Sequence, residues 1–169
     1  MEIIYNNGIY VSGQFLTPQQ TQNKPVVSLK GLHTNKNYTL IMSDPNAVGG
    51  NYIHWIVTNI HGNNFDSGKN LFSYYGPHPP KDSGKHNYIF LLYESEENMI
   101  ISLDPNQRQI ELEDILKKLF INSKPVYIKQ FISEYKQGGK RTKKRNNKRR
   151  SCKRRRSCKR RRSCKRRKY

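Results

Sequence analysis

Cysteine is missing from the first 151 residues of this 169-residue chain, whose three cysteines are Cys152, Cys158 and Cys164. A body without cysteine excludes the class of small secreted domains that depend on disulfides, and it fits a reducing compartment. The even spacing of the three cysteines does not match the spacing of zinc ligands. We therefore expect neither a disulfide framework nor a structural metal ion.

Long apolar runs are also missing, since no segment approaches the roughly 18 apolar residues of a membrane-spanning helix. Residues 1–6 have neither the basic segment nor the long apolar segment of a signal peptide. These absences predict an intracellular protein, in the cytoplasm or nucleus, without a transmembrane segment. The high content of Asn, Ile, Lys and Tyr is typical of an AT-rich genome, so a virion is the alternative location if the protein is viral.

Acidic residues are missing from residues 140–169, which contain 20 of the 32 Lys and Arg residues. The other 12 basic residues and all 12 acidic residues lie in residues 1–139, so the net charge of +20 belongs to the tail. A body of about 139 residues is long enough for one domain with a buried core. We predict a domain at 1–137 and a disordered tail at 138–169, because the tail repeats Ser-Cys-Lys-Arg-Arg-Arg, lacks apolar periodicity and repels itself.

A segment with this density of positive charge is expected to bind nucleic acid or another polyanion without sequence preference. The basic residues assigned to this contact are Arg149, Arg150, Lys153, Arg154, Arg155, Arg156, Lys159, Arg160, Arg161, Arg162, Lys165, Arg166 and Arg167. Ser151, Ser157 and Ser163 each follow two arginines, as kinase sites in basic segments do, and phosphate on them would weaken the contact. The alternatives are a solvated tail, a nuclear-import signal, or a packaging or scaffolding protein that works mainly through its tail.

Signatures of the common enzyme classes are missing as well. The chain has no nucleophile elbow, no P-loop and no metal-ligand spacing, so we predict that it is not an enzyme and uses no cofactor. A weak hydrolase in which Asp44, His54 and His86 carry out acid–base chemistry is the alternative.

Strand signals dominate the first hundred residues. Segments rich in β-branched and aromatic residues, with turn residues at their ends, predict strands. The predicted strands are 38–42, 54–60 and 88–93, with shorter ones at 9–11, 26–29 and 99–101 and a last one at 126–135. One helix is predicted at 111–120, where positions 112, 115, 116, 119 and 120 form an apolar stripe. This pattern predicts a mostly β protein, an antiparallel sandwich with one short helix near the end of the domain.

Five residues fall at or near the ends of the predicted strands: Asp44, His54, Gly76, His86 and Tyr88. Imidazole N–H groups, and backbone N–H groups near a glycine, can donate hydrogen bonds to a small anion. A carboxylate would repel an anion, so its expected role is to accept a bond from one histidine and favour the charged form of that ring. Taken singly, each of these residues also has a structural explanation, as a turn residue or a core histidine.

Four segments, Asp44–Ala47, His54–Asn59, Gly76–Pro80 and Gly84–Tyr88, resemble the phosphatidylethanolamine-binding protein family. The resemblance extends over roughly residues 10 to 136. It implies a β-sandwich whose pocket accepts a phosphate-type or phospholipid head group, in a binding module or regulator that is not an enzyme. No protein partner is indicated. The pocket residues that it implies are Asp44, Tyr52, His54, Tyr75, Gly76, Pro80, His86 and Tyr88.

The chain departs from the family pattern at three positions of these segments. Asn46 stands where the family has a second acid and Asn87 where it has an arginine, and the proline that closes the first segment is replaced by Val48 or skipped. We interpret the first two changes as coupled: an acid and a base that supported each other are both replaced by neutral amides, so that no buried charge is left unpaired.

Overall fold

The protein is described from a computed structural model, which describes residues 1–6, 8–95 and 101–135. The predicted tail at 138–169, with its polyanion contacts and phosphorylation sites, lies outside these residues, as does most of the strand expected at 99–101. Over the described ranges, no helix is long and apolar enough to cross a membrane.

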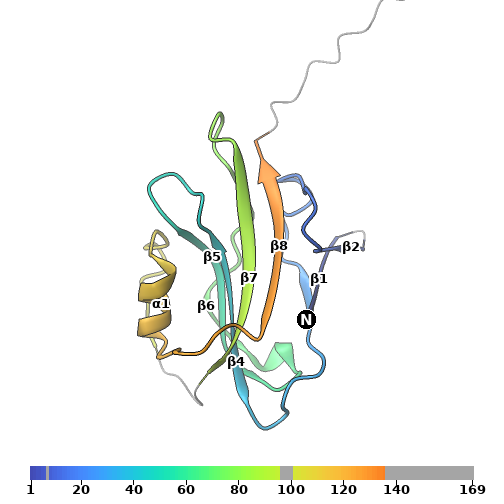
Figure 1. Ribbon diagram of the computed structural model, residues 1–169, viewed down its shortest axis with the longest axis vertical. Coiled ribbons are helices and arrows are strands. Elements are labelled where there is room, and N and C mark those ends of the chain that lie inside the picture. The colour runs from blue at the N-terminus through green and yellow to red at the C-terminus, as the bar shows by residue number, and fades with distance from the viewer. Residues whose placement is uncertain (7, 96–100, 136–169) are drawn as a thin grey trace, which may run out of the picture. The chain divides into compact units, whose positions relative to one another are not determined.

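Two antiparallel sheets and one short α-helix form the domain (Figure 1). The larger sheet has the strand order β6-β5-β4-β7-β8, with β4 (Asn37–Asp44), β5 (Tyr52–His61), β6 (Lys69–Phe72), β7 (Lys85–Ser95) and β8 (Tyr127–Glu134). The smaller sheet has the order β2-β1-β3, with β1 (Glu2–Tyr5), β2 (Ile9–Tyr10) and β3 (Val26–Ser28). A 3-10 helix, η1 (Phe65–Ser67), precedes β6, and α1 (Leu112–Lys118) precedes β8. The predicted antiparallel β-sandwich with one short helix is confirmed.

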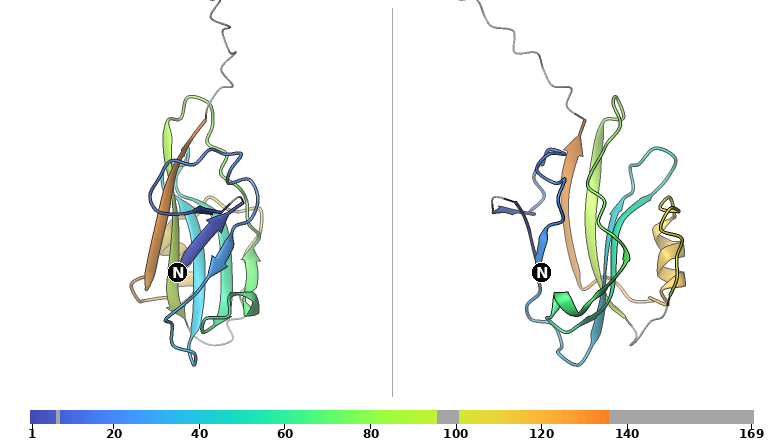
Figure 2. Two further views of the ribbon diagram at one scale, coloured as in Figure 1. Left: turned by 90° about the vertical axis from the view of Figure 1, so that its right-hand side faces the viewer. Right: turned by 180° about the vertical axis from the view of Figure 1, so that it is seen from behind.

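Both faces of the larger sheet are covered, by the smaller sheet on one side and by α1 on the other (Figure 2). Every residue of β4 is therefore buried. Leu40 and Met42 point into the core shared with β1 and β3, while Ile41, between them, points into the core under α1. Successive side chains of a strand face opposite sides, so a strand covered twice is apolar without alternation.

The helix is shorter than its apolar pattern predicted. Acidic residues lie in its first turn and Lys117 and Lys118 in its last, as the helix dipole favours. Ile115 and Leu119 are buried under it, but Phe120, which was expected on the same stripe, is 72% exposed. Phe120 lies beyond the last helical turn with a positive φ of 52°, so its side chain no longer follows the helical spacing.

The strand order brings three strand ends together. Because β4 is antiparallel to both β5 and β7, its last residues lie beside the first residues of the other two. Asp44 pairs with Tyr52 at the start of β5, and Ser43 pairs with Ile89 near the start of β7. Polar residues placed at these ends in the sequence therefore meet at one edge of the sheet.

Candidate ligand-binding site

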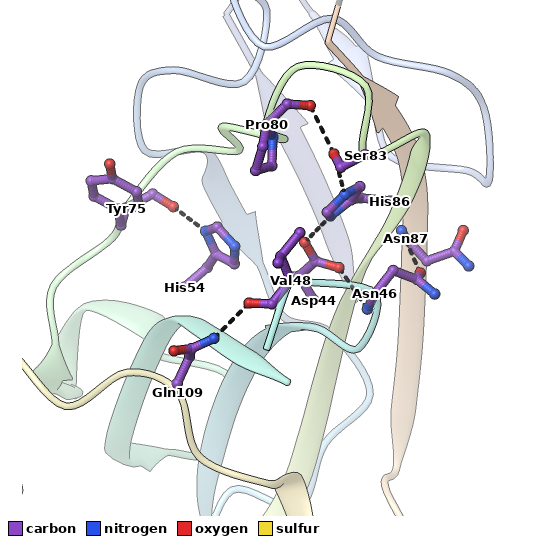
Figure 3. Close-up of polar contacts among 10 residues, drawn as sticks. All are labelled: Asp44, Asn46, Val48, His54, Tyr75, Pro80, Ser83, His86, Asn87 and Gln109. Atoms are coloured by element: carbon purple, nitrogen blue, oxygen red, sulfur yellow. Dashed lines mark hydrogen bonds and ion pairs between the residues drawn. The ribbon is translucent and has the colours of Figure 1, made fainter. Parts of the chain in front are cut away.

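A cavity of about 290 Å³ lies at this edge of the sheet. Seven of the eight pocket residues expected from the sequence line it, and Gly76 does not. The lining residues are Asp44, Ala47, Val48, Tyr52, His54, Tyr75, His78, Pro79, Pro80, His86, Tyr88 and Gln109. Figure 3 shows His54 and Tyr75 on one side of the cavity and Asp44, Ser83 and His86 on the other.

Asp44 and His86 form a buried pair at the ends of β4 and β7. The Asp44 Oδ2 to His86 Nδ1 distance is 2.6 Å, and the two residues are 2% and 1% exposed. The second carboxylate oxygen, Oδ1, accepts a 2.9 Å bond from the backbone N–H of Asn46. Burial first, and then the negative charge of Asp44 and a hydrogen bond to it, raise the pKa of Tyr88, so this hydroxyl stays protonated. The carboxylate thus has a hydrogen-bond partner on each of its two oxygens, which is what a buried charge requires.

The other nitrogen of His86 contacts a serine in the turn before β7. Ser83 Oγ lies 2.8 Å from His86 Nε2 and 2.8 Å from the carbonyl oxygen of Pro80. When the hydroxyl proton of Ser83 is directed at the Pro80 carbonyl, its oxygen accepts the Nε2–H of His86. In this arrangement both ring nitrogens donate, which is the pattern of an imidazolium paired with the Asp44 carboxylate.

His54 is held in a different way. Its Nδ1 lies 2.7 Å from the carbonyl oxygen of Tyr75, and the N–H of Tyr75 donates back to the carbonyl of His54 at 2.9 Å. Since the carbonyl accepts, Nδ1 carries the proton. Burial is the main cause that lowers the pKa of His54 to about 4, while the bond to Tyr75 acts in the opposite direction. At neutral pH the ring is neutral, and its Nε2 has a free lone pair.

Arg108 contacts the backbone on the side of the site where His54 and Tyr75 lie. Its guanidinium donates to the carbonyl oxygens of His54 and Ser73 at 3.1 and 3.0 Å. The guanidinium carbon also lies 5.9 Å from the centre of the Tyr75 ring. Arg108 therefore fixes the segment that carries Tyr75 against β5, although its side chain does not line the cavity.

Gly76 supports the pocket from outside it. A Cβ at this position would lie 2.9 Å from the carbonyl oxygen of Gln22, closer than real Cβ contacts allow. A glycine lets the loop after Tyr75 approach that backbone closely. The effect on the site is indirect, because the same loop presents the Tyr75 carbonyl to His54.

Five lining residues were not among those predicted: Ala47, Val48, His78, Pro79 and Gln109. Ala47 and Val48 belong to the loop after β4, and His78 and Pro79 lie between the predicted residues Gly76 and Pro80. Gln109 comes from an irregular segment, and its side chain donates a 2.7 Å bond to the carbonyl of Val48, which holds the loop after β4 in place (Figure 3). The segment Arg108–Ile110 fits the family pattern, but that fit does not mark Gln109 as a pocket residue.

The two amides that replace family charges are neighbours, as the sequence argument required. The side-chain oxygen of Asn46 accepts a 2.9 Å bond from the backbone N–H of Asn87. Both residues are exposed, however, so the premise that their charges would be buried is wrong. Any coupling between charges at these two positions is therefore a surface interaction, which is weak.

A larger hollow, of about 870 Å³, lies at the opposite end of the sheet, beside the start of β4 and the end of β7. Its lining residues include one ion pair, Lys36 with Glu94, at 2.9 Å and partly exposed. None of its described lining residues is a histidine or carries a buried charge, so we assign the chemistry to the smaller cavity. Among the residues that the structure describes, no group of three His, Cys, Asp or Glu side chains is placed to hold a metal ion.

Comparisons with known proteins identify relatives of the chain. A 26 kDa secreted antigen of Toxocara canis is 36% identical over 100 residues, which are 55% of this chain and 38% of that protein. Protein SELF-PRUNING of Solanum lycopersicum is 34% identical over 116 residues, which are 64% of this chain and 65% of that protein. The chain thus spans less than two thirds of the length of both relatives.

The fold has a match among solved structures. The phosphatidylethanolamine-binding protein from Plasmodium vivax aligns with a TM-score of 0.68 at 20% identity, covering 80% of this chain and 84% of that one. At this identity the match supports the fold alone. The family model described as phosphatidylethanolamine-binding protein matches residues 8–131. The chain belongs to the phosphatidylethanolamine-binding protein family, as its sequence motifs indicated.

Proposed function

We propose that this protein is a non-enzymatic binding module whose cavity takes a small phosphate-type head group. The observation that carries the proposal is the buried Asp44–His86 pair facing His54 across a cavity of about 290 Å³. Pockets for drug-sized ligands have volumes of about 300 to 1,000 Å³. The volume here suits a head group rather than a whole lipid with its chains.

The imidazolium of His86 supplies the charge that an anion needs. Asp44 holds the Nδ1–H, and the Nε2–H, now directed at Ser83, is the donor that an oxyanion would take. Ser83 lies in a turn that also contains Gly84, around which a Cβ would meet nothing within 4 Å. Ser83 is partly exposed in this turn, and a ligand oxygen would take the Nε2–H in its place.

The same contacts argue against hydrolysis. Both nitrogens of His86 are engaged, and a pKa of about 4 makes His54 a weak base at neutral pH. The hydroxyl of Ser83 gives its proton to Pro80 rather than to a base, so it is not activated as a nucleophile. A binding role accounts for these residues better than acid–base catalysis does.

Titration of the full chain with inorganic phosphate, followed by NMR of the histidine rings, tests the proposal. We expect the signals of His54 and His86 to shift and saturate, while those of His33, which is exposed and outside the cavity, do not. A panel of phosphoesters should show no turnover. Unchanged signals of both pocket histidines would refute the binding function, and turnover that disappears in His86→Ala would establish the hydrolase instead.

For the tail we propose a separate role, binding nucleic acid or another polyanion. The observation that favours it is the placement of 20 positive charges in residues 140–169, with no acid among them. If about ten phosphates of duplex DNA are neutralised, the logarithm of the binding constant falls with the logarithm of salt concentration with a slope near −9. A chain truncated after Gly139 should lose this binding, and retained binding would refute the role. The intracellular location stays a prediction, because one relative is called a secreted antigen.

A further inference from the structure

We infer that the cavity selects anions that carry a proton, such as hydrogen phosphate or a singly protonated phosphomonoester, and that His54 Nε2 accepts this proton in a hydrogen bond. The inference rests on the proposed function and specifies its ligand class. It comes from the asymmetry of the two histidines: one offers a charged N–H, and the other offers only a lone pair.

Two sets of contacts fix the tautomer and orientation of His54, one to its ring and one to its backbone carbonyl. The Tyr75 carbonyl, 2.7 Å from Nδ1, must receive a proton, because a bare nitrogen at that distance would place two lone pairs against each other. The carbonyl of His54 is itself held by Arg108 and by the N–H of Tyr75. The ring therefore stays oriented with Nδ1 toward Tyr75, and Nε2 is left as an acceptor on the side of the cavity.

The opposite wall provides the complementary group. His86 can donate through Nε2 to an anion that takes the place of Ser83, and the Asp44 carboxylate lies 2.6 Å from its Nδ1. A tetrahedral anion between the two rings would accept from His86 with one oxygen and meet the lone pair of His54 with another. If the second oxygen carries a hydrogen, it donates a hydrogen bond to His54 Nε2. If it carries none, its contact with this nitrogen is repulsive.

Groups from every element around the cavity act on this contact. Asp44 comes from the end of β4, Tyr52 from β5, and His86 and Tyr88 from β7. Tyr75 and His78 come from the loop between β6 and β7, and Arg108 lies behind His54. Of these, Asp44, His86, His78 and Arg108 change the field felt by any anion, protonated or not. Hydrogen phosphate and sulfate carry the same charge, so a comparison of these two anions under one condition largely removes the effect of the surrounding charges.

Sulfate is the matched probe, because it has the shape of phosphate but no proton at neutral pH. Measured by the shifts of His54 and His86 in the full chain, at fixed ionic strength, inorganic phosphate should bind at least about tenfold more tightly than sulfate, which is the usual cost of leaving one buried polar group unpaired. Dimethyl phosphate, which imitates the diester linkage of a phospholipid and also lacks a proton, should bind as weakly as sulfate.

Methyl phosphate supplies a pH-dependent probe. A phosphomonoester loses its last proton near pH 6, whereas inorganic phosphate keeps one well above neutral pH. The affinity for methyl phosphate relative to inorganic phosphate should therefore fall as the pH rises through about 6. A constant ratio would contradict the inference without any variant.

The variant His54→Asn isolates the acceptor. Its amide N–H can replace Nδ1–H toward the Tyr75 carbonyl, but nothing replaces Nε2. The phosphate-to-sulfate affinity ratio should drop to near one, and His33→Asn, the same change at an exposed histidine, should leave the ratio unchanged. Should His54→Asn fail to fold, the pH comparison with the unaltered chain still decides.

The outcomes separate the inference from the function on which it rests. Equal affinity for phosphate and sulfate in the unaltered chain would leave the anion pocket standing and overturn the proton requirement. Tight binding of dimethyl phosphate would also overturn it and point to a phospholipid diester as the source of the phosphate. If neither phosphate nor sulfate shifts the two histidines, the proposed function and the inference both fall.

Discussion

On the β7 side of the pocket, His86 donates to the Asp44 carboxylate at 2.6 Å and to Ser83 at 2.8 Å. On the β5 side, His54 donates to a backbone carbonyl, that of Tyr75, at 2.7 Å. The two rings are almost equally buried, at 1% and 4% exposure, so burial alone does not distinguish them. The partner decides: a carboxylate compensates the cost of burying an imidazolium, and a carbonyl dipole does not.

The largest expected effect comes from removing the carboxylate that makes the two sides different. Asp44→Ala leaves the imidazolium of His86 buried without a counter-charge and removes the acceptor of the Tyr88 hydroxyl. We expect the free energy of unfolding at pH 7 to fall by roughly 3 to 5 kcal/mol, measured by urea denaturation. Asp44→Asn, which keeps an acceptor of the same shape, should cost less. A loss below about 1 kcal/mol for Asp44→Ala would show that His86 is not charged in the folded protein.

His54, the neutral histidine, should make the free energy of unfolding depend on pH. The pKa of His54 is about 4 in the folded protein and about 6.5 when unfolded, so the unfolded chain binds the proton first. The contribution of neutral His54 to the free energy of unfolding is fully present above about pH 6.5 and is lost as the pH falls toward 4. The loss amounts to roughly 3 kcal/mol.

Denaturation of His54→Asn at the same pH values isolates this contribution, since carboxylates titrate in both proteins. The difference in unfolding free energy between the unaltered chain and the variant should change by roughly 3 kcal/mol between pH 6.5 and pH 4. A difference that stays constant over this range would mean that His54 accepts a proton in the folded state as readily as in the unfolded state.

The loop that presents Tyr75 can be disturbed without touching either histidine. Gly76→Ala places a Cβ 2.9 Å from the carbonyl oxygen of Gln22, a backbone atom that cannot move alone. We expect a loss of about 1 to 3 kcal/mol in unfolding free energy and weaker phosphate binding, because the Tyr75 carbonyl shifts away from His54. Gly84→Ala is the control: it strains a positive φ of 81° but meets no atom within 4 Å, so it should cost only about 1 kcal/mol. Equal losses for the two variants would contradict the close approach at Gly76.

The strand signals in the sequence located the long strands and the place where they meet. Residues 38–42, 54–60 and 88–93 are apolar without alternation because the larger sheet is covered on both faces, and these segments became β4, β5 and β7. The antiparallel order then brought Asp44 to the beginnings of β5 and β7, which is why polar residues at strand ends identified the cavity.

The remaining features depend on packing that leaves little trace in a residue pattern. β6, Lys69–Phe72, has two polar residues and lies at the edge of the sheet, so no apolar run announces it. Ser83, whose hydroxyl contacts Nε2 of His86, has the sequence signature of an ordinary turn residue. Gln109 donates to the carbonyl of Val48, 61 residues earlier in the chain, and Arg108 donates to the carbonyl of His54, 54 residues earlier, and only the folded backbone places them there.

The smallest expected effect concerns Asn46 and Asn87, the two amides close to the Asp44–His86 pair. Asn46→Asp adds a negative charge two residues after Asp44. Asn87→Arg adds a positive charge in β7, at the residue whose backbone N–H already donates to the side chain of residue 46. We expect Asn46→Asp alone to destabilise the domain slightly and the double variant to recover part of the loss. Both sites are exposed, so the coupling energy in the double-mutant cycle should be about 0.2 to 1 kcal/mol and should shrink in high salt. Strictly additive effects at low salt would show that the two family charges did not support each other, whereas a coupling unchanged by salt would mean that the pair is shielded from solvent after all.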